Sequence, residues 1–116
     1  MNVDIAWWDL DGSGQTVDSL RAHLRGGAAM PWADVPGLRL KLWIADRATN
    51  RWGAVMIWEQ DPPAPATLPP NQAARLLGGR PMHRQRFGVE AAVEGVHSGS
   101  SLRGRGPALE GGATDA

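Results

Sequence analysis

Two apolar segments joined by a short polar turn constrain this chain more than any other feature. Residues 36–44 read PGLRLKLWI and residues 51–59 read RWGAVMIWE, and both alternate in the way that β-strands do. They predict one long β-hairpin, with strands from about Leu38 to Ala45 and from Arg51 to about Glu59. Because alternate side chains of a strand point to opposite faces, the hairpin has two faces of different chemistry.

The turn length predicts how the two strands pair. A four-residue turn at 47–50 gives the pairs Asp46–Arg51, Trp43–Ala54, Lys41–Met56 and Arg39–Trp58. One face is then aliphatic, and we expect it to carry the helices: Val3, Ile5, Trp7, Leu38, Leu40, Leu42, Ile44, Val55, Ile57, Val89, Ala91 and Val93. The other face mixes aromatic and charged residues: Asp4, Trp8, Arg39, Lys41, Trp43, Trp52, Met56, Trp58, Glu90 and Glu94. Since Trp, Met and Arg are enriched in subunit interfaces, the second face is predicted to form a dimer.

The flanking segments predict a βαββαβ order. In chain order we expect a strand over 2–10, a helix between Thr16 and Gly26, the hairpin, a proline-rich connector over 61–70, a brief helix over 71–77 and a strand over about 88–96. This is the ferredoxin-like α+β arrangement, with two helices on one face of a four-stranded antiparallel sheet. Residues 1–97 are predicted to form this domain, and residues 98–116, rich in Gly, Ser, Ala and Arg, to form a disordered tail.

Composition excludes several classes of function. Lys plus Arg and Asp plus Glu are 12 each, so no global field favours nucleic acid or an anionic membrane as a partner. The absence of cysteine excludes thiol catalysis, disulfides and thiolate metal sites. Neither a signal-peptide pattern nor an apolar run near the roughly 18 residues of a membrane span occurs, and we expect a cytoplasmic location.

Tryptophan is over-used, with six residues beside one Phe and no Tyr. These rings either fill the core of a small domain or line a site for an aromatic guest. Three of them, Trp7, Trp8 and Trp32, are candidate walls of a substrate pocket.

The run Pro36-Gly37-Leu38, followed by Lys41, Trp43 and a strand beginning near Gly53, resembles the YdhR-type monooxygenase family. That family is similar in fold to the antibiotic-biosynthesis monooxygenases of the dimeric α/β-barrel superfamily. The resemblance implies a homodimer and a pocket between sheet and helices in each protomer. It also implies oxidation of polycyclic phenols or quinols by dioxygen without metal, flavin or haem. The proline-rich 61–70 segment departs from the family pattern.

A cofactor-free oxygenase needs a base and a cation that stabilises an anion. His83 is the predicted general base and Arg86 the predicted anion stabiliser, because both lie in the basic stretch 80–87. The predicted dimer face holds Lys41, Trp43, Met56 and Trp58. The residues that carry the resemblance and the catalytic candidates are thus expected on different faces.

The leading hypothesis is a small cofactor-independent monooxygenase-like tailoring enzyme of secondary metabolism that acts on an aromatic or polycyclic apolar substrate, with dioxygen as co-substrate. The alternatives are a non-oxidative isomerase or cyclase with the same pocket, and a non-catalytic ligand-binding module. Histidines at positions 23, 83 and 97 lack metal-site spacing, so no metal is expected.

Overall fold

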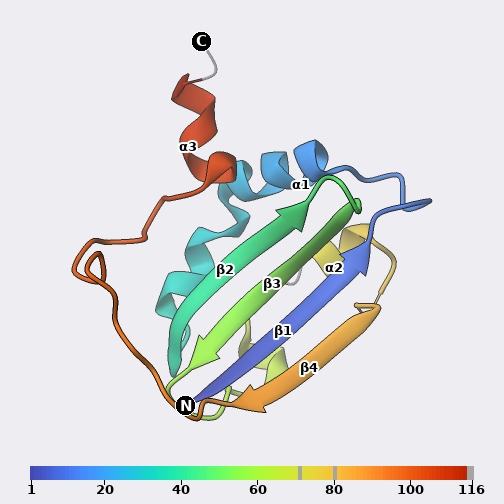
Figure 1. The fold of residues 1–116 in the computed structure, drawn as a ribbon. Coiled ribbons are helices and arrows are strands. Elements are labelled where there is room, and N and C mark those ends of the chain that lie inside the picture. The colour runs from blue at the N-terminus through green and yellow to red at the C-terminus, as the bar shows by residue number, and fades with distance from the viewer. Residues whose placement is uncertain (71, 80, 115–116) are drawn as a thin grey trace.

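A four-stranded antiparallel sheet with strand order β2-β3-β1-β4 forms the centre of the molecule (Figure 1). The structure is a computed structural model that describes residues 1–70, 72–79 and 81–114. Its strands are β1 (Asn2–Asp9), β2 (Leu38–Asp46), β3 (Arg51–Trp58) and β4 (His83–Gly88). Its α-helices are α1 (Val17–His23), α2 (Gln72–Leu76) and α3 (Pro107–Thr114).

Three further helical segments join these elements: the π-type turn η1 (Leu24–Ala28) and the 3-10 helices η2 (Met30–Asp34) and η3 (Pro65–Thr67). The predicted α+β class with a four-stranded antiparallel sheet is confirmed, and the strand order is compatible with a ferredoxin-like fold. No described helix is both long enough and apolar enough to cross a bilayer. Asn71 and Arg80, which belong to the predicted second helix and the basic stretch, lie outside the described residues.

The hairpin pairs as the turn length predicts over most of its length. Asp46 lies opposite Arg51, Trp43 opposite Ala54, and Lys41 opposite Met56. The prediction for the far end is wrong, because an irregularity between Leu38 and Leu40 places Leu38, and not Arg39, opposite Trp58. A bulge of this kind adds a residue to one strand and shifts the pairing beyond it.

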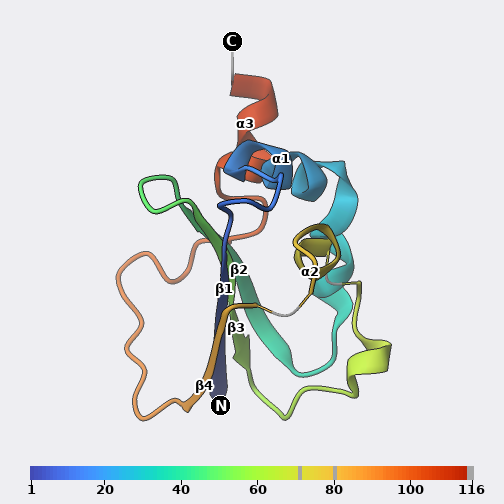
Figure 2. The same cartoon turned by 90° about the vertical axis from the view of Figure 1, so that its right-hand side faces the viewer.

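The helices cover the aromatic face of the sheet, so the predicted assignment of the two faces is reversed. Figure 2 shows the sheet edge-on with α1 and α2 on the same side. The buried cluster on that side joins sheet tryptophans to α1 and its extension: Trp8, Leu10, Val17, Leu20, Leu24, Ala29 and Trp52. Trp43 packs against this cluster and Trp58 is 1% exposed, so neither lies on a free sheet face. The predicted dimer face is therefore the interior of the protomer.

Helix α1 begins where its capping residue predicts. The Thr16 hydroxyl accepts a hydrogen bond from the Ser19 amide at 3.0 Å, and the Ser19 hydroxyl accepts one from the Thr16 amide at 2.9 Å. This reciprocal pair satisfies two amides that have no partner inside the helix. The regular helix ends before a turn in which Gly27 has a φ of 111°, a conformation that favours glycine.

Strand β4 lies several residues before its predicted position. It pairs with β1 from Trp7–His83 to Asn2–Gly88, and the Val89 amide then donates to the Met1 carbonyl. No residue of β1 remains beyond that point, so the alternating residues after Gly88 have no strand to pair with. The predicted strand over 88–96 is wrong, and Glu90 and Glu94 do not lie on the sheet.

The segment after β4 leaves the sheet on the side opposite the helices and passes beside β2 to reach α3 (Figures 1 and 2). Within the predicted tail, α3 lies near α1 and η1, and Arg25 donates hydrogen bonds to the carbonyls of Ala108 and Pro107 at 3.0 and 3.2 Å. Leu109 packs against the buried cluster. The structure thus differs from a uniformly disordered tail at residues 107–114.

Candidate functional site

A groove of about 680 Å³ lies along strand β2, between the η1–η2 segment and the chain at 102–109. Its volume falls in the roughly 300–1,000 Å³ range of small-molecule sites. Its floor is aromatic, from Trp32, Trp43 and Trp52. The groove runs along the edge of β2, so residues from both faces of this strand and from its neighbours add aliphatic lining: Leu24, Met30, Leu38, Leu40, Leu42, Ile44, Leu102 and Leu109. We call this region the β2 groove.

Lys41 is the ionisable side chain at the aromatic end of the β2 groove. Its ammonium lies 3.3 Å from the centroid of the Trp32 ring and 4.8 Å from that of Trp43. Burial, and then the charge of Arg84, lowers the pKa of Lys41 from 10.5 to about 7. The two indole faces act in the opposite direction, since they attract the cation. Near neutral pH this amine can therefore exchange a proton with a bound ligand.

Local sequence explains why Trp32 reaches Lys41. Pro31 lies in the first turn of η2, where a missing N–H costs nothing, and the Trp32 amide donates to the Ala29 carbonyl at 3.2 Å. Gly37, with a φ of 82°, then turns the chain into β2. This short connection brings Trp32 back over the strand that carries Lys41.

A second, smaller cavity of about 30 Å³ adjoins the groove, and we call it the inner cavity. The two share Lys41 and the three tryptophans, and the inner cavity adds His23 and Ala73. Its volume has room for about one water molecule. A ring-sized ligand would therefore fit only in the groove and not in the inner cavity.

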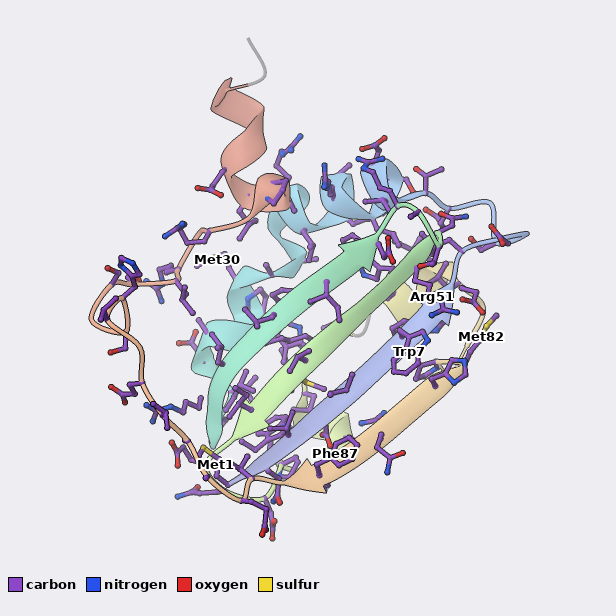
Figure 3. The ribbon with its side chains drawn as sticks, viewed as in Figure 1. Met1, Trp7, Met30, Arg51, Met82 and Phe87 are labelled. Carbon is purple, nitrogen blue, oxygen red and sulfur yellow. The ribbon has the colours of Figure 1, made fainter. Side chains whose placement is uncertain are left out.

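The predicted catalytic pair does not form one site. His83 and Arg86 are three residues apart on β4, and alternation places them on opposite faces. His83 is exposed and stacks on Trp7, with ring centroids 4.6 Å apart, on the face without helices. Figure 3 shows Trp7 on this open face. The β2 groove contains neither His83 nor Arg86.

Arg86 instead forms an ion pair with a buried carboxylate. Its Nε and Nη2 donate to Asp4 at 2.6 and 2.9 Å, and Asp4 is 2% exposed. These hydrogen bonds hold the pKa of Asp4 below its usual value, although burial alone would raise it. Arg86 therefore has a stabilising role in the covered face, where a lone carboxylate would be costly.

The predicted pocket walls are dispersed. Trp8 lies in the buried cluster, where its Nε1 donates to the Gly79 carbonyl at 3.3 Å, and Trp7 lies on the open face. Among the three candidates, Trp32 alone lines the β2 groove. Of the predicted dimer residues, Lys41 and Trp43 line the groove, whereas Met56 and Trp58 do not.

Sequence reasoning assigned Lys41 to the dimer face and not to a pocket, although a signal for a pocket was present. A lysine that alternates with leucines next to a tryptophan marks a cation on an otherwise apolar strand. In the described ranges, no three metal-ligating side chains gather in one place. The sequence matches no protein-family model, and no curated protein is significantly similar to it.

Proposed function

We propose that this protein is a cofactor-independent monooxygenase-like enzyme that acts on an aromatic, apolar substrate in the β2 groove. The observation that carries the proposal is the Lys41 amine, held against Trp32 and Trp43 with a pKa of about 7, at the aromatic end of the groove. The resemblance around Pro36-Gly37-Leu38, Lys41 and Trp43 supports the same reaction class.

In the proposed reaction, neutral Lys41 takes the proton of a substrate phenol. A base whose pKa is near the working pH is effective in this role. The electron-rich phenolate then reduces dioxygen and a ring carbon forms a C–O bond to it, giving a hydroperoxide. Loss of water breaks the O–O bond and the C–H bond at that carbon and leaves a quinone carbonyl. One phenol and one dioxygen thus give one quinone and one water, with dioxygen as the oxidant.

The tryptophans have two roles in this scheme. Their flat faces hold aromatic rings at little entropic cost, and they exclude water from the amine. The Lys41 ammonium formed by the first step then stabilises the phenolate and the reduced oxygen species.

Aerobic and anaerobic turnover of a panel of polycyclic hydroquinones and phenols by the metal-stripped protein tests this proposal. We expect oxygen-dependent product that falls at least about 100-fold in Lys41→Met, which keeps the volume and removes the base. His83→Ala is the matched control on the opposite face and should retain the wild-type rate. Equal product without oxygen would instead support an isomerase or cyclase, and binding without product a ligand-binding module.

We also propose that the protein is a homodimer that associates through its open sheet face. The charged residues of this face, Asp9, Asp46 and Arg51, gather at the end where β2 turns into β3, and Arg51 pairs with Asp9 at 3.0 Å. The rest of the face carries no Asp, Glu, Lys or Arg: Val3, Ile5, Trp7, Leu40, Leu42, Ile44, Gly53, Val55, Ile57, His83, Gln85 and Phe87. Leu42, Ile44 and Phe87 are 40%, 41% and 51% exposed. Large exposed apolar faces mark interaction sites, and a flat aliphatic sheet packs well on a second sheet.

The mass of the protein in solution tests the dimer. Val55→Asp places a charge at the centre of the open face and should give a folded monomer by light scattering. Arg47→Asp, in the exposed turn between β2 and β3, is the control and should keep the wild-type mass. A dimer of unchanged stability in Val55→Asp would contradict this interface.

A further inference from the structure

The charged residues that line the β2 groove are all basic, and the proposed reaction does not require so many of them. None of its lining residues is acidic. Five of them are basic: Arg21, Arg39, Lys41, Arg103 and Arg105. The whole chain carries equal numbers of acidic and basic residues, so this segregation is local. A concave surface of one sign focuses its field on the space that it encloses.

Acidic neighbours balance only part of this charge. Arg39 pairs with Glu59 at 2.6 Å and Arg105 with Glu110 at 3.7 Å, both at exposed positions of the rim. Within the described residues, no ion pair joins Arg21, Lys41 or Arg103 to an acid. Three cations from three separate elements, namely α1, β2 and the chain before α3, therefore line the groove without an ion pair, and the nearest acid to act on Arg21, Asp18, is itself paired with Arg47.

The remaining lining is apolar and aromatic, so the groove combines two kinds of recognition. Trp32, Trp43 and Trp52 supply aromatic lining, with Lys41 over the Trp32 ring, and the leucines around them supply aliphatic contact. Guanidinium groups bind carboxylates through paired N–H donors and do so better than isolated ammonium groups. We infer that the β2 groove takes an aromatic substrate that carries an anionic group, such as a carboxylate, with the rings on the tryptophans and the anion at Arg21 and Arg103. The inference rests on the proposed function for the location of the site and adds the class of its ligand.

Matched ligands test the inference by titration calorimetry: 9-anthracenecarboxylate and its neutral amide, which share the same rings and nearly the same size. We expect the carboxylate to bind at least about 10-fold more tightly at low salt, and this advantage to shrink as salt rises. The Arg21→Gln/Arg103→Gln variant should lose about 10-fold in affinity for the carboxylate and keep its affinity for the amide. Arg47→Gln removes an exposed arginine outside the groove and serves as the control.

Three outcomes would overturn the inference. The two ligands could bind with equal affinity, neither could bind, or the tighter binding of the carboxylate could persist in Arg21→Gln/Arg103→Gln. Its failure is distinct from that of the proposed function. Oxygen-dependent turnover of neutral hydroquinones, lost in Lys41→Met, would preserve the proposed reaction even if no preference for anions existed. A carboxylate preference without any oxygen-dependent turnover would preserve the ligand class as a binding property and overturn the oxygenase.

Discussion

The two faces of the sheet differ in what they pack against. The covered face carries four tryptophans, a buried Asp4 paired with the half-exposed Arg86, and the partly buried Lys41, and it lies under helices. The open face is mostly aliphatic, with Asp9, Asp46 and Arg51 confined to its turn end, and no helix of the described residues covers it (Figure 2). Apolar character alone would predict the opposite arrangement, with the aliphatic face under the helices and the aromatic face open.

Side-chain volume explains the difference. The helical segments are short, and those that pack on the sheet contribute many small residues: Ala28, Ala29, Ala73 and Ala74. Since protein interiors are close-packed, the sheet must supply the missing volume, and tryptophan supplies the most per residue. A face of Leu, Ile and Val would leave voids under such helices. A face that mixes aromatic and charged residues can therefore form the core when its charges are paired and the helices above it contribute small side chains.

The adjacent residues Trp8 and Trp7 give the sharpest test of this comparison. Trp8 lies in the buried cluster and Trp7 on the open face. We expect Trp8→Ala to lower the free energy of unfolding by about 3–5 kcal/mol, because the cavity has no residue to fill it. Trp7→Ala should cost much less when urea unfolding is measured at low protein concentration, where association contributes little. Equal losses would mean that both faces are covered.

The ion pair between buried Asp4 and half-exposed Arg86 tests whether the covered face tolerates charge only in pairs. Arg86→Leu leaves a 2% exposed carboxylate without its partner and should cost about 3 kcal/mol in urea unfolding. The Asp4→Leu/Arg86→Leu variant should recover most of that loss. Because the pKa of Asp4 is lowered in the folded state, its contribution is complete above the usual pKa and disappears as pH falls through the lowered value.

An exposed pair with a similar pKa effect is the control for Arg86. Arg47 also lowers the pKa of its partner, Asp18, but both side chains are more than half exposed. Solvent screens such pairs, so Arg47→Leu should leave the urea midpoint unchanged. A loss in Arg47→Leu equal to that in Arg86→Leu would show that burial does not decide the effect.

Turn length and alternation made the strand pairing predictable. The pairs Asp46–Arg51, Trp43–Ala54 and Lys41–Met56 follow from a four-residue turn, and the partition of residues between faces follows from the period of two. Which face the helices cover was not predictable from polarity, because Trp, Met and the stem of Lys are apolar enough for either environment. The end of β4 depends on where β1 begins, which the alternation in residues 88–96 does not encode.

The candidate site was harder to predict than the fold for the same reason. Trp32 was assigned to a pocket, and Lys41 and Trp43 were singled out by the resemblance, yet they were assigned to different sides of the sheet. Once the faces are exchanged, these three residues come together at one groove. His83 and Arg86 looked like partners because they are close in sequence, but an odd separation along a strand divides them between faces.

Lys41 gives the last test, because it places an ionisable amine in the covered face. The charge of Arg84 on β4 acts on it and His23 of α1 lines the same cavity, and neither offers it a negative charge. The unfolded chain keeps the Lys41 proton up to its usual pKa of 10.5, whereas the folded chain releases it near pH 7. Stability should therefore rise with pH across this interval, by about 2 kcal/mol between pH 7 and pH 9.

Urea unfolding of wild type and Lys41→Met over that pH range measures the contribution of this amine. The variant should lack the rise and should be more stable than wild type at pH 7, since methionine has no charge to bury. A wild-type curve parallel to that of Lys41→Met would mean that the Trp32 and Trp43 faces, at 3.3 and 4.8 Å, stabilise the ammonium enough to offset its burial. Lys41 would then act as a permanent cation, and the proposed proton transfer would lose its base.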